Sequence, residues 1–311
     1  LNLTQCHAVR ETRSKNLIET HFSPYRIPVC LDPAFFVKGP ALKRRKSGIT
    51  ALVLRSEGWG IRLSKESRRK FSEKFQGDAY NSTKSFQTAL ELAQKTLVDP
   101  KNRIHLFIQT VADQELAMAL VKALADDGLE DRVEVSRPNS VDEYLEQLSI
   151  VDRGIASRFH AIILGLVVRK PVYGLFFDVH GHKIPGLFEM LGVSDHCFAM
   201  SEFNPKTLVA KVFKKFGDEV AYSTAVQSQL KILKNETVNW LSDALVCNDD
   251  PVLIADLLSA RNALNNYGFE IATDGIKAAG AKQLSAIERV SKAAAARDSK
   301  KLGELKSDLA V

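Results

Sequence analysis

The chain has 311 residues, of which 45% are apolar and 26% are charged, and its formal net charge is +6. This length predicts one large domain or two ordinary ones, and this balance is typical of a soluble globular protein. No run approaches the roughly 18–20 apolar residues that cross a bilayer, and residues 1–10 lack a secretory pattern, so we expect neither a membrane span nor a leader.

Cysteine and histidine spacing gives little sign of a metal. The four cysteines, Cys6, Cys30, Cys197 and Cys247, show no CxxC pairing. This argues against a zinc site and is consistent with a reducing, cytoplasmic compartment. His180 and His182 flank a glycine, an arrangement that is more often incidental than metal-binding. We therefore predict no metal and no cofactor.

Basic residues cluster at Lys43–Lys46, at Arg68–Lys70 and again after Lys277. Such patches suit phosphorylated substrates, anionic lipid headgroups or nucleic acid, but they are also common on plain solvated surfaces. The basic runs lack interleaved aromatic residues, so we expect no nucleic-acid partner. Peripheral contact with the inner face of the membrane stays open as an expectation.

The first 48 residues predict the end of a domain, followed by a linker. A helix-like stretch begins at Ser14, and Ile27–Leu31 has the pattern of a strand. Residues 1–38 are too few to bury a core alone, so we interpret them as the end of an amino-terminal α/β domain. Proline, glycine and like charges in residues 39–48 predict an extended linker.

Residues 49–217 alternate regularly between apolar runs and helix-like segments. The strands are expected at Ile49–Leu54, Ile104–Ile108, Val133–Val135, Gly154–Ala156 and Pro171–Phe177. The helices are expected after a Ser82 cap, from Asp113 to Leu124, after a Ser140/Glu143 capping box, from Ser157 to Val168, from Gly186 to Leu191 and from Pro205. Such alternation predicts an α/β fold with a Rossmann-like doubly wound parallel sheet, which binds ligands at the carboxyl ends of its strands.

Residues 218–311 predict an α-helical extension. Apolar residues at Val226, Leu230 and Leu233 follow the spacing of three to four residues that an amphipathic helix requires. A second helix is expected to start at Pro251. The Ala/Lys-rich tail, residues 277–311, predicts either a marginal helix or a disordered segment.

The segment Gly154–Ala161 carries the clearest sign of chemistry. A strand ends there, Ser157 can cap a helix, and Arg158 and His160 fall in the first turn. Helix N-termini attract phosphates and carboxylates, an arginine fork binds such groups at two points, and histidine exchanges protons near neutral pH. Arg158 could instead pair with a neighbouring carboxylate and His160 could be a core residue, but the position at a strand end favours a ligand site.

Other polar residues follow predicted strand ends and could converge on the same site. They are Arg55, Gln109, Asp113, Asp178 and Lys183. Each could also be an ordinary cap or surface charge. We predict that they bind a donor substrate together with Ser157, and that Arg158 and His160 are catalytic.

The order of these segments resembles a known family. Residues 149–191, with Ser157-Arg158-Phe159-His160-Ala161, Lys170-Pro171-Val172 and Lys183, look like the carboxyl-terminal domain signature of polysaccharide pyruvyl transferases. The resemblance extends back to Arg55, to Asp113, to Val9-Arg10-Glu11 with Ser14 and to Asp32-Pro33-Ala34-Phe35, and it spans about residues 8 to 216.

The resemblance implies two Rossmann-like domains facing a cleft, as in two-domain glycosyltransferases. The family uses phosphoenolpyruvate, without a metal, to place a pyruvyl ketal on a sugar of an exopolysaccharide, capsule or cell-wall polymer. Arg158 and His160 match the family's motif, and Lys183 matches its following basic residue less closely. Compared with the family pattern, we expect most of the amino-terminal domain to lie outside the sequence as given and the extension after Phe216 to be longer than usual, so the acceptor site is unassigned.

This reading predicts a transferase whose partners are phosphoenolpyruvate and a sugar or lipid-linked oligosaccharide acceptor. Arg55, Arg158 and the helix N-terminus would hold the two anionic groups of the donor, and His160 would act as the general acid. Two alternatives stay open. One is a nucleotide-sugar glycosyltransferase of the same two-domain fold, and the other is a non-catalytic adaptor that keeps the fold.

Overall fold

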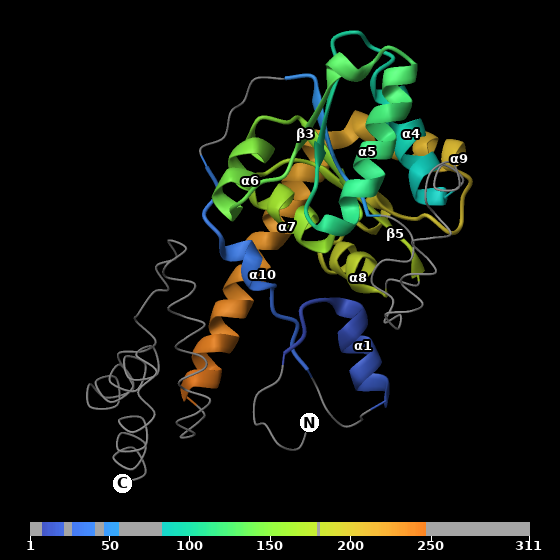
Figure 1. Ribbon diagram of the computed structural model, residues 1–311. Helices are drawn as coiled ribbons and strands as arrows, with labels where there is room; N and C mark the ends of the chain where they lie inside the picture. Colours follow the sequence, from blue (N-terminus) through green and yellow to red (C-terminus); the bar gives the residue numbers. More distant parts are fainter. Residues whose placement is uncertain (1–7, 22–26, 41–46, 56–82, 179–180, 247–311) are drawn as a thin grey trace, which may run out of the picture. The chain divides into compact units, whose positions relative to one another are not determined.

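A computed structural model describes residues 8–21, 27–40, 47–55, 83–178 and 181–246 (Figure 1). The chain divides into two compact units, Leu1–Arg10 with Ile18–Lys38 and Lys231–Val311, and Glu11–Leu17 with Gly39–Leu230. The domain boundaries expected from the sequence remain predictions. The Lys43–Lys46 and Arg68–Lys70 clusters, Ser82, His180, the helix expected at Pro251 and the Ala/Lys-rich tail lie outside the described residues.

The larger unit is built on a six-stranded parallel sheet with the order β3-β2-β1-β4-β5-β6. The strands are β1 Ile49–Val53, β2 Arg103–Phe107, β3 Val133–Ser136, β4 Arg153–Ala156, β5 Val172–Phe176 and β6 Cys197–Ala199. This order is that of a Rossmann-like, doubly wound sheet and confirms the predicted fold class. The sequence predicted the first five strands and missed β6.

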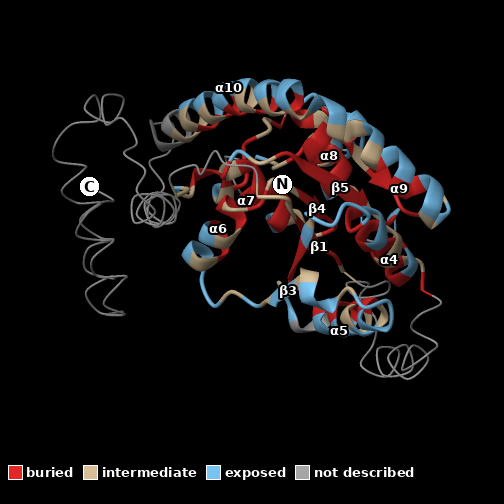
Figure 2. Ribbon diagram, turned by 90° about the horizontal axis from the view of Figure 1, so that it is seen from above, coloured by how far each residue is buried: buried red, intermediate tan, exposed pale blue. Residues whose placement is uncertain are grey.

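Helices cover both faces of this sheet. They are α4 Lys84–Thr96, α5 Val111–Asp126, α6 Val141–Ser149, α7 Phe159–Val167, α8 Lys183–Met190 and α9 Pro205–Lys214, with 3₁₀ turns at Glu130–Arg132, Ser194–His196 and Lys215–Asp218. Helix α4 packs against α5 and α9, α6 packs against α7, and α8 packs on β5 (Figure 2). Leu52, Leu92, Leu120 and Tyr173 are fully buried and belong to the core that α4, α5 and α9 share with the sheet.

Side-chain caps begin several of these helices. The Ser140 hydroxyl accepts the Glu143 N–H at 3.1 Å, which confirms the expected Ser140 cap. The Glu143 carboxylate accepts the Asn139 N–H at 2.8 Å and not that of Ser140, so the expected capping box is only half formed. Asn204 caps α9 through the Thr207 N–H at 2.9 Å. Helix α4 is capped by Thr83, one residue after the expected Ser82.

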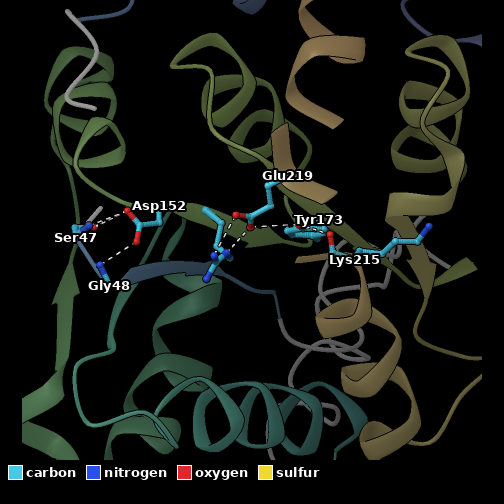
Figure 3. A network of polar contacts seen from close by, with 7 residues as sticks. Ser47, Gly48, Asp152, Tyr173, Lys215 and Glu219 are labelled. Carbon is cyan, nitrogen blue, oxygen red and sulfur yellow. Dashed lines mark hydrogen bonds and ion pairs between the residues drawn. The ribbon is translucent and has the colours of Figure 1, made fainter. Parts of the chain in front are cut away.

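A network of polar contacts lies at the amino-terminal ends of the strands (Figure 3). Asp152, just before β4, accepts the N–H groups of Ser47 and Gly48, both at 2.9 Å, and so fixes the entry to β1. Arg153 pairs with Glu219 through two hydrogen bonds of 2.5 and 3.1 Å. These contacts hold together the ends of the strands opposite to those where a doubly wound sheet binds ligands.

The smaller unit has little regular pairing among its described residues. The strand expected at Ile27–Leu31 is wrong, because Val29 makes a single parallel bridge with Val9 and no longer ladder. A 3₁₀ turn, η1 Pro33–Phe36, follows. The Arg10 guanidinium pairs with Asp32 at 2.6 Å, and the Thr237 hydroxyl accepts the Leu31 N–H at 2.9 Å.

Two helices have residues in both units, α1 Thr12–His21 and α10 Glu219–Val246. Helix α10 contains the three apolar residues that predicted it, and Val226, Leu230 and Leu233 are all buried. None of the helices in the described part of the chain is both long and apolar enough to cross a membrane.

Candidate active site

The candidate site lies where the strand order reverses, between β1 and β4. These neighbouring parallel strands pair from Thr50 with Arg153 to Val53 with Ala156, so they end side by side. The chain then continues from β1 to Arg55 and from β4 to Ser157 and Arg158. A doubly wound sheet binds its ligands at this reversal point, outside the carboxyl ends of the strands.

Ser157 ties the two strand ends together. Its hydroxyl accepts the Arg55 N–H at 2.8 Å, and its own N–H donates to the Val53 carbonyl at 2.9 Å. The residue is buried, with 4% exposure. The expected capping role of Ser157 is therefore wrong, since the N-cap of α7 is Arg158 and the Ser157 hydroxyl serves the neighbouring loop instead.

Arg158 is held by two residues from the turn after β2. Its Nε donates to Asp113 Oδ1 at 3.0 Å, and its Nη2 donates to Thr110 Oγ1 at 2.9 Å and also pairs with Asp113. The arginine side chain is 15% exposed and the aspartate 2%. The alternative in which Arg158 pairs with a neighbouring carboxylate is thus what the structure shows, and this pairing also fixes the guanidinium plane.

Asp113 also organises the start of α5. Its Oδ2 accepts the Thr110 N–H at 3.0 Å and the Thr110 hydroxyl at 3.2 Å. The N-cap of α5 is Thr110, so the helix begins at Val111 and not at Asp113, which the sequence predicted as the start and as its cap. A role for Asp113 in direct donor binding remains a prediction.

Arg55 is half-buried and forms no ion pair within the described residues. Its Nε is buried and has no hydrogen-bond partner among the described residues. Burial and, to a lesser extent, the nearby positive charge of Arg158 lower the pKa of Arg55, Asp113 partly opposes them, and the resulting pKa is about 10. The group is still charged at neutral pH. Because two guanidinium groups share one carboxylate here, the site has a net positive charge and suits an anionic ligand.

His160 lies in the first turn of α7 and is exposed. Its ring contacts the Phe159 ring edge-on, with 5.7 Å between centroids. The side chain is therefore a surface group on the helix that starts at Arg158, and the core alternative for His160 is wrong. The described residues contain no cluster of three or more histidine, cysteine, aspartate or glutamate side chains that could hold a metal ion.

A family model for polysaccharide pyruvyl transferases matches residues 2–175, which is more than half of the 311 residues. The chain belongs to this family. No curated protein matches the sequence.

Several solved structures resemble this pyruvyl transferase family member at low identity. The crystal structure of TarM shares 12% identity, with a TM-score of 0.47, over 78% of this chain and 44% of TarM. An O-GlcNAc transferase from Thermobaculum terrenum shares 13% with a TM-score of 0.43, over 73% and 39%. A glycosyltransferase from Rickettsia africae shares 11% with a TM-score of 0.43, over 75% and 63%. The chain thus spans less than two thirds of each of these proteins.

Three other residues that the sequence predicted for the donor site also follow strand ends. Gln109 is half-buried after β2, Asp178 follows β5 and accepts the Ser201 hydroxyl at 2.6 Å, and Lys183 is exposed as the first residue of α8. Within the described ranges, no hydrogen bond or ion pair joins these three residues to Arg55 or Arg158. Their part in donor binding remains a prediction.

Sequence reasoning missed Thr110 as a site residue. Its signal was available, because Thr110 and Asp113 have the spacing of a capping box directly after β2. Sequence reasoning also did not connect Glu11 and Ser14 with His182. These residues join segments that are far apart in the chain, since the residue numbers of Ser14 and His182 differ by 168.

Proposed function

We propose that this chain provides the donor site of a phosphoenolpyruvate-dependent transferase, which forms a pyruvyl ketal on the hydroxyl groups of a sugar in a cell-surface glycan. The observation that carries the proposal is the half-buried Arg55, whose buried Nε has no hydrogen-bond partner within the described residues, beside the preoriented Arg158. Family membership supports the pyruvyl chemistry.

The donor has two anionic groups, a phosphate and a carboxylate, joined through one enol carbon. The Nε of Arg55 has the unsatisfied donor, so we assign Arg55 to one of these groups. The Nε and Nη2 of Arg158 already donate to Asp113 and Thr110, so its Nη1 would contact the other group together with the N–H groups at the start of α7. Two fixed cations also stabilise charge that develops on a departing phosphate.

His160 is assigned to the general acid because it is exposed in the first turn of the same helix. Ketal formation starts when a proton is added to the methylene carbon of the donor, which makes the central carbon electrophilic. A positioned acid contributes about 10²–10⁴-fold to such a step. The acceptor sugar, and any lipid carrier for it, belong to the proposal only as a chemical class.

Calorimetry with phosphoenolpyruvate tests the donor site directly. Arg55→Gln should weaken binding about 10- to 100-fold, because a hydrogen bond to a charged group contributes roughly 1.5–3 kcal/mol. Arg169→Gln is the matched control. Arg169 is an exposed arginine in the turn before β5, so it lies at the amino-terminal ends of the strands and not at the carboxyl ends that form the candidate site. The control should bind like the wild type.

Turnover is then measured as phosphate release with a panel of methyl glycosides. Release that depends on the glycoside and falls at least 100-fold in His160→Ala would support both the reaction and the acid. Wild-type protein that binds uridine diphosphate and not phosphoenolpyruvate would favour the nucleotide-sugar alternative. Protein that binds neither compound would favour the adaptor alternative.

A further inference from the structure

A second polar cluster lies in the larger unit, at the first turn of α1. The Glu11 carboxylate is fully buried, with 0% exposure. Its Oε2 accepts the Arg13 N–H at 2.8 Å, and its Oε1 accepts the Ser14 N–H at 2.9 Å. A buried carboxylate with two backbone donors is a fixed negative group that water does not screen.

The start of α1 is fixed against α8 by close packing. A Cβ atom at Gly186 of α8 would collide with the Glu11 carboxylate, so only glycine allows this approach. The Arg13 guanidinium pairs with Glu189, also of α8, with Nε 2.8 Å and Nη2 2.6 Å from Oε1. Glu11 and Ser14 are therefore held in place relative to the N-cap residue of α8, which is His182.

The Ser14 hydroxyl and the Glu11 carboxylate both lie close to the same nitrogen of His182. Its Nε2 lies 3.3 Å from Ser14 Oγ and 3.8 Å from Glu11 Oε1. A nearby carboxylate favours the tautomer in which Nε2 carries the proton, and this tautomer leaves the lone pair on Nδ1. The His182 side chain is 41% exposed, and Nδ1 makes no hydrogen bond within the described part of the chain. The ring is thus oriented from one side and available from the other.

The position of His182 relates this cluster to the donor site. Strand β5 pairs with β4 in parallel, so the segments that follow them leave the sheet at the same edge. One segment carries Arg158, and the other leads to His182 at the start of α8. We propose that His182 is the general base that takes the proton from the attacking sugar hydroxyl, with Glu11 and Ser14 as positioning residues. This inference rests on the proposed function.

The proposed step balances as follows. The acceptor oxygen forms a bond to the central carbon of the protonated donor, and its proton moves to His182 Nδ1. The bond between that carbon and the phosphate oxygen then breaks, and the phosphate leaves with the electron pair and one proton. A second hydroxyl of the same sugar closes the ketal and loses its own proton. Of the two hydroxyl protons, one replaces the proton that the acid gave to the methylene carbon and one accompanies the phosphate.

The test replaces His182 with glutamine in the full chain and compares it with His21→Gln, a change at an exposed histidine of α1. Binding of phosphoenolpyruvate should stay within about twofold of wild type, whereas glycoside-dependent phosphate release should fall by about 10²-fold or more. Release within threefold of the His21→Gln control would overturn the base assignment, and so would an equal loss of donor binding.

Ser14→Ala tests positioning, because it removes one partner of Nε2 and leaves His182 in place. It should lower the turnover number about 3- to 10-fold with donor affinity unchanged, and Ser14→Thr, which keeps a hydroxyl, should recover most of the loss. A turnover number equal to that of wild type in Ser14→Ala would contradict the positioning role.

Ring nitrogen spectra of the full chain test the tautomer without any acceptor. We expect the His182 signals, identified by their loss in His182→Gln, to show the Nε2–H form in the neutral ring. An Nδ1–H form would overturn the inference even where the wild type transfers pyruvate. Wild-type protein that shows the Nε2–H form but binds no phosphoenolpyruvate would refute the proposed function, and the base assignment with it, on a separate readout.

Discussion

Two guanidinium groups and one carboxylate meet at the carboxyl ends of β1 and β4, and they are not equally paired. Arg158 has Asp113 and Thr110, whereas the Nε of Arg55 has no partner among the described residues. A buried donor without a hydrogen-bond partner costs free energy, and a ligand that accepts a hydrogen bond from it would offset this cost. The same arginine that weakens the free protein would therefore strengthen the complex with an anion.

Arg55→Met separates these two effects. Without ligand, the free energy of unfolding should stay the same or rise by up to about 1 kcal/mol, because the desolvated charge is removed. Phosphoenolpyruvate at 100 times its dissociation constant should stabilise the wild type by about 2.7 kcal/mol and the variant by far less. Urea denaturation with and without the ligand measures both quantities. A large loss of stability in the free variant would show that Arg55 is a structural cation.

Asp113→Asn should destabilise the protein by about 2–3 kcal/mol. The change leaves Arg158 without its anionic partner, and removing one member of a buried pair typically costs about 3–5 kcal/mol, less here because Arg158 is 15% exposed. Urea denaturation of Asp113→Asn, Arg158→Gln and the double variant forms a thermodynamic cycle. Single effects that simply add would mean that the two groups do not interact in solution.

At the scale of elements, the strands that the sequence predicted are those with a clear apolar run. Ile49–Val53 and Val172–Phe176 are buried and lie within the expected ranges. Strand β6, Cys197–Ala199, was missed because three residues are too few to show a period. Ile27–Leu31 has strand-like residues, yet Val29 meets only one bridging partner, and residue preference alone does not make a ladder.

The candidate site was predictable to the extent that topology alone places residues. Arg55, Ser157 and Arg158 could be predicted because each follows a strand, and parallel strands end at one edge. The caps were harder, since Thr110 and Ser157 both have the residue type for a cap and only Thr110 serves as one. The contact of Glu11 with His182 depends on packing between helices that no local pattern encodes.

Gly186→Ala tests the packing of the start of α1 against α8. Alanine favours helices by about 1 kcal/mol over glycine, so a neutral site would gain stability. We expect the opposite, a loss of about 1–3 kcal/mol, because the new methyl group must displace the buried Glu11 carboxylate. Gly217→Ala is the matched control, since a Cβ atom there meets nothing within 4 Å. Thermal unfolding of both variants decides the matter, and a stabilised Gly186→Ala would show that α1 does not dock on α8 as described.

At the scale of the whole molecule, two buried histidines link stability to pH. His105 stacks on Phe107 with 4.1 Å between ring centroids, and its Nδ1 is buried without a partner among the described residues. His196 stacks on Tyr222 with 4.1 Å between ring centroids, and its Nε2 is also buried without a hydrogen-bond partner among the described residues. Burial lowers the pKa of both side chains below the ordinary value of 6.5, and nearby carboxylates oppose the shift only in part.

The direction of the pH dependence follows from these lowered pKa values. As the pH falls below 6.5, the unfolded chain binds protons at His105 and His196 before the folded protein does, so the free energy of unfolding decreases. Above pH 6.5 both states are largely neutral at these positions and the contribution is fully present. Asp195, whose pKa lies below 3.8, adds a further loss only in more acidic solution. We expect lower stability at pH 5.5 than at pH 7.5 in urea denaturation. Replacing both histidines with glutamine should flatten this difference, whereas an undiminished slope would place the responsible groups elsewhere in the chain.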